Sequence, residues 1–198
     1  MVQKGIQTKE NIVDKSLHLF SVKGYYNTSV NDILDAAGIT KGGLYGHFQS
    51  KEEIWHAAYD RAVAIWKAIV FKDIEGIEDP LKRIKAALEN DLKHYLGADV
   101  FEGGCFFLNM QVELAGQSEE MSRKVYDGIM GFSGLLARWL KEAEAKKMLK
   151  PGLDAAQTAE FMVTAINGCA ALYASRHGAD VIETTLSQIC LYIEEIRQ

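Results

Sequence analysis

Three glycines lie within one short segment of the chain, residues 40–48. If this segment is a helix with Leu44 pointing inward, each residue advances by 100°, so Gly42 and Gly46 face outward. A glycine within a helix costs about 1 kcal/mol relative to alanine. A surface that must approach a phosphate backbone closely would account for this cost. A loosely wound surface turn is the alternative.

A second group of polar side chains lies on an apolar segment. Cys105, Asn109 and Glu113 recur at i, i+4 and i+8, so they form one line on a helix that is otherwise almost entirely apolar. Such polar groups are either capped and solvated or directed into a cavity. The aromatic residues around them can line that cavity or pack in the protein core. A redox- or electrophile-sensing role for the Cys105 thiol is a further alternative.

The sequence contains none of the common signatures of catalysis. It has no nucleophile elbow, P-loop, dinucleotide fingerprint or HExxH motif. The five histidines have no metal-ligand spacing among themselves or with the three cysteines. We therefore expect no enzymatic activity, no metal site and no cofactor.

Composition is typical of a globular protein with one or two domains. The chain has 198 residues, a formal net charge of −5, and 48% hydrophobic and 10% aromatic residues. No apolar run approaches the length of a membrane-spanning helix, and the N-terminus resembles no secretion signal. We expect a cytoplasmic protein that does not span a membrane, with its cysteines as free thiols.

Helix start and stop signals predict an all-α fold without strands. Thr28 is the predicted N-cap of the second helix, and Ser50 and Asp154 are predicted to begin capping boxes. The helices are expected at about residues 9–23, 29–37, 40–48, 50–71, 79–96, 105–114, 118–147, 154–177 and 181–196.

The segment from Thr28 to Ile54 has the pattern of a helix-turn-helix, with Gly38 in the tight turn. It resembles the DNA-binding domain of the TetR/AcrR family of transcriptional regulators over roughly residues 6–66. The resemblance is carried by Gly24-Tyr25, Thr28-Ser29-Val30, Ile33, Ala36-Ala37-Gly38-Ile39, Thr40-Lys41-Gly42, Leu44-Tyr45, His47-Phe48 and Ser50-Lys51-Glu52.

The resemblance implies a homodimer that inserts two recognition helices into successive major grooves of operator DNA, about 34 to 36 Å apart. It implies a DNA-binding domain at residues 6–66, with its helix-turn-helix at about 29–48, and a helical effector-binding and dimerisation domain at 67–198. The implied DNA contacts are Thr28, Ser29, Thr40, Lys41, Gly42, Gly43, Tyr45, His47 and Lys51.

The implied function is a repressor that a small, largely apolar molecule releases from its operator. The expected effector contacts are Trp66, Tyr95, Phe101, Cys105, Phe106, Asn109, Met110, Glu113 and Trp139. Small and branched apolar residues on the last two helices suit a two-fold interface through Ile166, Cys169, Tyr173, Leu186, Ile189 and Ile193. A helical small-molecule-binding protein or enzyme without DNA binding is the alternative from a different class.

Overall fold

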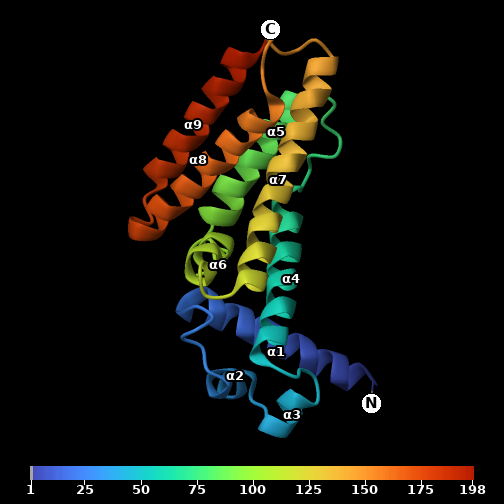
Figure 1. Ribbon diagram of the computed structural model, residues 1–198, viewed down its shortest axis with the longest axis vertical. Coiled ribbons are helices and arrows are strands. Elements are labelled where there is room, and N and C mark those ends of the chain that lie inside the picture. The colour runs from blue at the N-terminus through green and yellow to red at the C-terminus, as the bar shows by residue number, and fades with distance from the viewer. Residues whose placement is uncertain (1) are drawn as a thin grey trace.

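The computed structural model describes residues 2–198, with side chains from Gly5 onward. Every regular element among these residues is a helix, so the predicted all-α class is confirmed. Figure 1 shows a small body of α1, α2 and α3 below a larger bundle that contains α5 to α9, with α4 leading from one into the other.

The helices follow the predicted order along the chain. Their bounds are α1 Val2–Lys23, α2 Val30–Ala37, α3 Lys41–Tyr45, α4 Lys51–Val70, α5 Pro80–Glu89, the π-helix η1 Asn90–Leu96, α6 Phe106–Leu114, α7 Glu119–Ala145, α8 Ala155–Arg176 and α9 Ala179–Ile196. The predicted domain boundary after residue 66 falls inside α4, which is continuous across it.

Side-chain caps explain where several helices begin. Ser118 and Asp154 cap α7 and α8 as predicted, but Asp154 only accepts from the Ala156 and Gln157 N–H groups, so its predicted capping box lacks the return bond from the Gln157 side chain. Ser50 accepts a hydrogen bond from the Glu53 N–H at 3.1 Å, but the Glu53 carboxylate returns to the Gln49 N–H, so this capping box is incomplete. The cap of α2 is Ser29 rather than the predicted Thr28.

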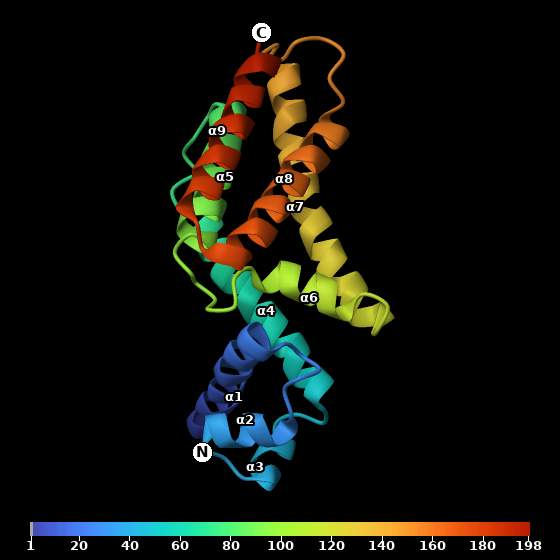
Figure 2. The same ribbon diagram turned by 90° about the vertical axis from the view of Figure 1, so that its left-hand side faces the viewer.

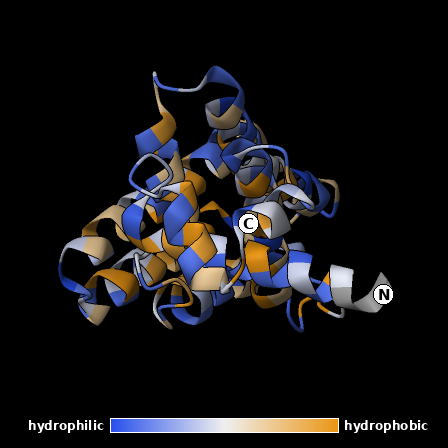
Figure 3. Ribbon diagram, turned by 90° about the horizontal axis from the view of Figure 1, so that it is seen from below, coloured by the Kyte–Doolittle hydropathy of each residue, from blue (hydrophilic) through white to orange (hydrophobic). Residues whose placement is uncertain are grey.

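Apolar residues of α1 to α4 form the core of the lower body. Phe20, Ile33, Leu44 and Phe48 are buried there, as their helical spacing predicts. Figure 3 shows the molecule from below, with hydrophobic and hydrophilic residues alternating along the helices. This alternation is typical of amphipathic helices.

The upper bundle is built around α7, α8, α5 and η1. The predicted helix from Pro80 to Leu96 is present, but its last seven residues, Asn90–Leu96, form the π-helix η1. No helix among residues 2–198 is long and apolar enough to cross a membrane.

Candidate functional site

The helix-turn-helix lies at the lower end of the molecule, where Figure 2 shows α2 and α3 turned away from the upper bundle. Gly38 ends α2 with φ +65°, a left-handed conformation that a glycine adopts without strain. The chain then reverses into α3, which Thr40 caps. The turn predicted at Gly38 is therefore present.

Helix α3 turns its glycines toward solvent. Leu44 is buried, whereas Gly42 and Gly46 are exposed, and a Cβ added at Gly42 would meet no atom within 4 Å. Lys41 is exposed on the same helix, and the exposed fraction of Tyr45 is 47%. The outer face of α3 therefore offers bare backbone flanked by a cation and a phenol.

Two predicted contact residues cap helices while remaining at the surface. Ser29 Oγ accepts a hydrogen bond from the Asp32 N–H at 3.1 Å and donates one to Asp32 Oδ2 at 2.6 Å. Thr40 Oγ1 accepts one from the Gly43 N–H at 3.2 Å. The side chain of His47 is half-buried.

The structure places Thr28 and Lys51 differently from the expectation. Thr28 is fully buried, and its hydroxyl donates to the Gly24 carbonyl at 2.6 Å, so it cannot reach a phosphate. Lys51 Nζ donates to the carbonyls of Tyr25 and Thr28 at 2.8 and 2.9 Å and lies over the Tyr25 ring. Burial lowers the pKa of Lys51, partly opposed by Glu113. Both side chains position the loop before α2.

Glu113, at the end of α6, binds the same loop. Its carboxylate accepts hydrogen bonds from the backbone N–H groups of Tyr25 and Tyr26, at 2.9 and 2.8 Å. Gly24 has φ +84°, and a Cβ there would overlap the Glu113 carboxylate, so a glycine is required. The loop that leads into the helix-turn-helix is therefore attached to α6.

A cavity of about 470 Å³ opens between α4, η1, α7 and α8, with the start of α6 at one wall. Its lining is mainly aromatic and aliphatic. The lining residues are Tyr59, Val63, Trp66, Lys67, Phe71, Asp91, Tyr95, Leu96, Cys105, Phe107, Asp127, Gly128, Ile129, Gly131, Phe132, Leu135, Arg138, Val163, Ile166, Asn167 and Ala170.

Three of the nine expected effector contacts line this cavity: Trp66, Tyr95 and Cys105. The other six, Phe101, Phe106, Asn109, Met110, Glu113 and Trp139, lie outside its lining.

The neighbours of these residues explain the difference. Met110 Sδ accepts a hydrogen bond from the buried Trp55 indole at 3.3 Å, and Asn109 donates to the Gly103 carbonyl at 2.7 Å. Phe106 is fully buried against Phe101. Phe107, the next residue on α6, faces the cavity instead.

Sequence reasoning missed Asp91, whose carboxylate is the buried charge of the cavity. Its Oδ1 accepts a hydrogen bond from the Trp66 indole N–H at 2.7 Å. Desolvation raises the pKa of Asp91 to about 6. Asp91 follows Ile84 and Leu88 at helical spacing, and an acidic residue on an apolar face was the available signal.

The thiol alternative finds no support at Cys105. Burial raises the pKa of Cys105 to about 11, so the reactive thiolate is scarce near neutral pH. No lysine or arginine is among the groups that perturb it.

The residues expected at the dimer interface are mostly core residues of the single chain. Cys169, Tyr173, Leu186, Ile189 and Ile193 are all buried within it, and Ile166 lines the cavity. The amphipathic stripe of α9 was predicted correctly, but it packs on its own chain. The apolar side chains exposed on these helices are Phe161 and Leu172 of α8 and Leu191 of α9.

Comparisons with known proteins agree with this arrangement. Residues 12–58 match the family described as bacterial regulatory proteins, tetR family, and residues 80–188 match the tetracyclin repressor-like C-terminal domain. The chain belongs to the TetR family.

Individual relatives extend the match over the whole chain. The HTH-type transcriptional regulator in the lacX 3′ region of Lactococcus lactis subsp. lactis is 30% identical over 66% of this chain and 72% of that protein. The HTH-type transcriptional repressor ComR of Escherichia coli K12 is 27% identical over 87% and 81%. The crystal structure of a TetR transcriptional regulator from Chloroflexus aurantiacus J-10-FL superposes with a TM-score of 0.92, at 27% identity and 98% coverage of both chains.

This TetR-family chain is a DNA-binding transcriptional regulator and not an enzyme. Regulators of the family bind operator DNA and form dimers. The helix-turn-helix at α2 and α3 lies within residues 12–58, which match the tetR family.

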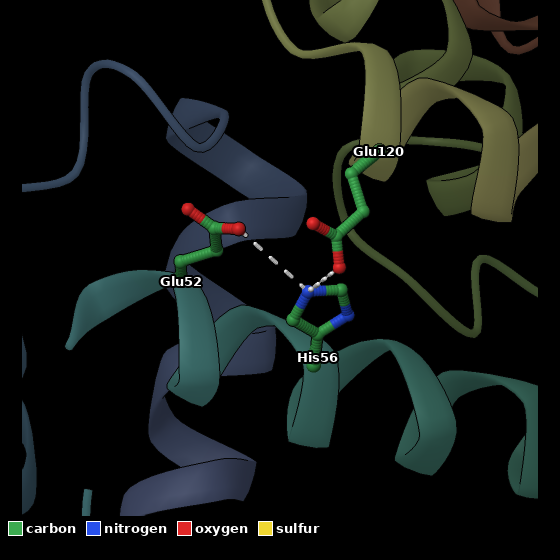
Figure 4. Close-up of side chains that lie close together, drawn as sticks. All are labelled: Glu52, His56 and Glu120. Atoms are coloured by element: carbon green, nitrogen blue, oxygen red, sulfur yellow. Dashed lines mark ion pairs between the residues drawn. The ribbon is translucent and has the colours of Figure 1, made fainter. Parts of the chain in front are cut away.

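A cluster of charged side chains joins α4 to α7 in this TetR-family chain. Figure 4 shows His56 between Glu52 and Glu120, with Nε2 at 3.9 and 3.7 Å from their carboxylates. Lys124 Nζ lies 3.4 Å from His56 Nδ1 and pairs with Asp60. Because both glutamates are exposed and a cation adjoins the imidazole, we interpret the cluster as polar contacts between the two helices, with Lys124–Asp60 as their ion pair, rather than a metal site.

Proposed function

We propose that the protein is an operator-binding repressor that a small molecule, bound in the cavity, releases from DNA. The observation that carries the proposal is the position of α6. Cys105 and Phe107 at its start line the cavity, and Glu113 at its end binds the loop before α2. A repressor is named among the relatives. We retain residues 6–66 and 67–198 as the proposed domains.

The proposed DNA contacts are those predicted residues that remain at the surface. Lys41 and Tyr45 supply a charge and a hydroxyl for phosphate oxygens, and Ser29 and Thr40 lie at the starts of their helices. Gly42 and Gly43 allow the backbone to approach DNA closely, and His47 borders this surface. Thr28 and Lys51 fix the loop that carries it.

Ligand binding would act on DNA binding through α6 and α4. A molecule bound against Phe107 favours one position of α6. Because Glu113 on α6 is hydrogen-bonded to the backbone N–H groups of Tyr25 and Tyr26, a shift of α6 moves the loop before α2 with it. Helix α4 also lines the cavity, through Tyr59 and Trp66, and its first residue Lys51 holds the same loop. The ligand needs to favour an arrangement in which the two recognition helices no longer match the groove spacing.

We place the dimer interface on the exposed face of α8 and α9. Phe161 and Leu172 lie eleven residues apart on α8, about three helical turns, and Leu191 lies on α9; their exposed fractions are 53%, 62% and 60%. Gly168, between Phe161 and Leu172, has open space around its Cβ position and permits close approach of a partner helix. The occupant of this face is a second copy of the chain.

Selection of bound fragments from genomic DNA would supply the operator for testing the proposal. Glu113→Ala removes the acceptor of two backbone N–H groups, so we expect operator affinity to fall about tenfold, equal to about 1.4 kcal/mol, and release by an inducer to weaken. Glu102→Ala, which alters an exposed glutamate of the same region, is the matched control. Unchanged affinity and release in Glu113→Ala would refute the role of α6.

A further inference from the structure

Two polar groups at the buried end of the cavity lack full hydrogen bonding. Asp91 is 6% exposed, and the Trp66 indole is the hydrogen-bond donor that the described side chains provide to its carboxylate. Tyr95 is 4% exposed; its hydroxyl adjoins the Cys105 thiol and the Phe106 N–H but makes no hydrogen bond of normal geometry with the described residues. An unsatisfied buried polar group costs about 1 to 3 kcal/mol, and more when it is charged. Both groups line the same cavity.

Aromatic rings surround these two groups. The Trp66 ring lies 5.0 Å from Phe132, 5.5 Å from Phe71 and 6.2 Å from Phe107, measured between ring centroids. Phe107 is also 6.2 Å from Tyr95. Aromatic faces carry negative electrostatic potential and attract cations.

The other charged residues of the lining are at the cavity mouth. Lys67, Asp127 and Arg138 are all exposed, so solvent screens them. Among the described lining residues, Asp91 is the one charged group that is buried. The deep part of the cavity therefore has negative potential from the Asp91 carboxylate, and aromatic rings surround it.

We propose that the effector is an organic amine that binds as a cation, with an aromatic or alicyclic body. Its ammonium N–H groups donate to the Asp91 carboxylate and to the Tyr95 hydroxyl oxygen, while its body lies among Trp66, Phe107 and Phe132. The bound cation neutralises the buried carboxylate, and the Tyr95 hydroxyl gains its missing partner. This inference rests on the proposed function of the cavity as the effector site.

The arrangement requires Asp91 to be ionised. Since desolvation raises the pKa of Asp91 to about 6, the carboxylate is charged near neutral pH and mostly protonated near pH 5. Amine binding should therefore weaken as the pH falls through 6. The titratable or charged groups that face this site are Tyr95 of η1, Cys105 at the start of α6, Cys169 of α8, Tyr59 and Lys67 of α4, and Asp127 and Arg138 of α7.

Three probes of matched shape test the charge preference by calorimetry: 2-naphthylmethylamine, 2-naphthylmethanol and 2-naphthoate. At neutral pH we expect the full-length protein to bind the amine at least about tenfold more tightly than the alcohol, and the carboxylate more weakly than either. Asp91→Asn keeps an acceptor for Trp66 but loses the charge, and should lose the preference for the amine. Glu75→Gln, an exposed position in the loop between α4 and α5, is the control for net charge.

Tyr95→Phe is a second variant, which removes the hydroxyl and keeps the aromatic ring. It should bind the amine about two- to tenfold more weakly, the equivalent of one hydrogen bond. Thermal melting would verify that each variant is folded.

An amine that binds no more tightly than the alcohol would overturn the inference, as would a preference that survives in Asp91→Asn. Failure of all three probes to bind the wild type would also overturn it. Operator binding by the same preparations separates the two hypotheses. Protein that binds operator but prefers no amine leaves the proposed function standing, whereas protein that selects no DNA fragment contradicts the proposed function itself.

Discussion

Two lysines ten residues apart illustrate how one residue type takes different roles. Lys41 is exposed on α3, whereas Lys51 is half-buried and donates to two backbone carbonyls. Both belong to the family pattern, and both were expected to bind phosphate. The sequence could not separate them, because the partners of Lys51 lie 23 and 26 residues away along the chain.

Salt dependence of operator binding distinguishes the two lysines. Lys41→Ala should reduce the slope of log affinity against log salt by about 1 per protomer, because one phosphate contact is lost. Lys51→Ala should weaken binding and lower thermal stability but leave the slope close to that of the wild type. Anisotropy titrations over a salt series measure both. If the two variants reduced the slope equally, Lys51 would also contact a phosphate, contrary to this prediction.

The buried Asp91 carboxylate should make the folded chain less stable as the pH rises from about 4 to about 6. Its pKa is about 6 in the folded chain and near 3.8 when unfolded, so burial of the charge destabilises the folded state once the pH exceeds both values. The penalty is absent below about pH 4 and complete above about pH 6, where it amounts to about 2 to 3 kcal/mol.

Asp91→Asn should therefore unfold at higher denaturant than the wild type at neutral pH and at similar denaturant near pH 4. Denaturant titrations at both pH values measure the difference, with Glu75→Gln, an exposed carboxylate in the loop between α4 and α5, for comparison. A variant that is less stable than the wild type at neutral pH would show that the carboxylate has a stabilising partner.

At the scale of elements, capping chemistry and apolar spacing predicted most of the helices. The starts of α3, α4, α7 and α8 follow from Thr40, Ser50, Ser118 and Asp154. The π-helix η1 was not predictable, because a π-turn depends on packing around it rather than on local propensity.

Orientation was harder to predict than helix position. Helix α6 is apolar nearly all round, so its sequence does not reveal that Phe107 faces the cavity and Phe106 the core. For α9 the buried face was identified, but amphipathicity does not specify whether the covering partner belongs to the same chain. Ile189 and Ile193 were assigned to a dimer for this reason.

The capping box of α2 gives a prediction for this element. Ser29→Ala removes the acceptor of the Asp32 N–H, and should lower the free energy of unfolding by about 1 kcal/mol. Asn31→Ala, an exposed position in the first turn of the same helix, should have a smaller effect. Denaturant unfolding followed by circular dichroism compares the two. Equal losses would mean that the cap does not fix the start of α2.

For the whole molecule, we expect the exposed face of α8 and α9 to form the interface of the dimer. Leu172→Glu combined with Leu191→Glu places charges on the proposed interface, and should convert a dimer to folded monomers with much weaker operator binding. Val112→Glu changes an apolar residue on α6 that is also exposed, and should leave the dimer intact. Analytical ultracentrifugation measures whether each variant is a monomer or a dimer. A dimer that persists in the double variant would place the interface elsewhere.

Cavity occupancy and operator binding are linked in our account, so each must weaken the other by the same factor. The most direct test is calorimetric titration of an inducing compound, identified by release of the selected operator, into the free protein and into the protein–operator complex. We expect the complex to bind the inducer about 5 to 150 times more weakly than the free protein does. Equal affinities in the two titrations would contradict it.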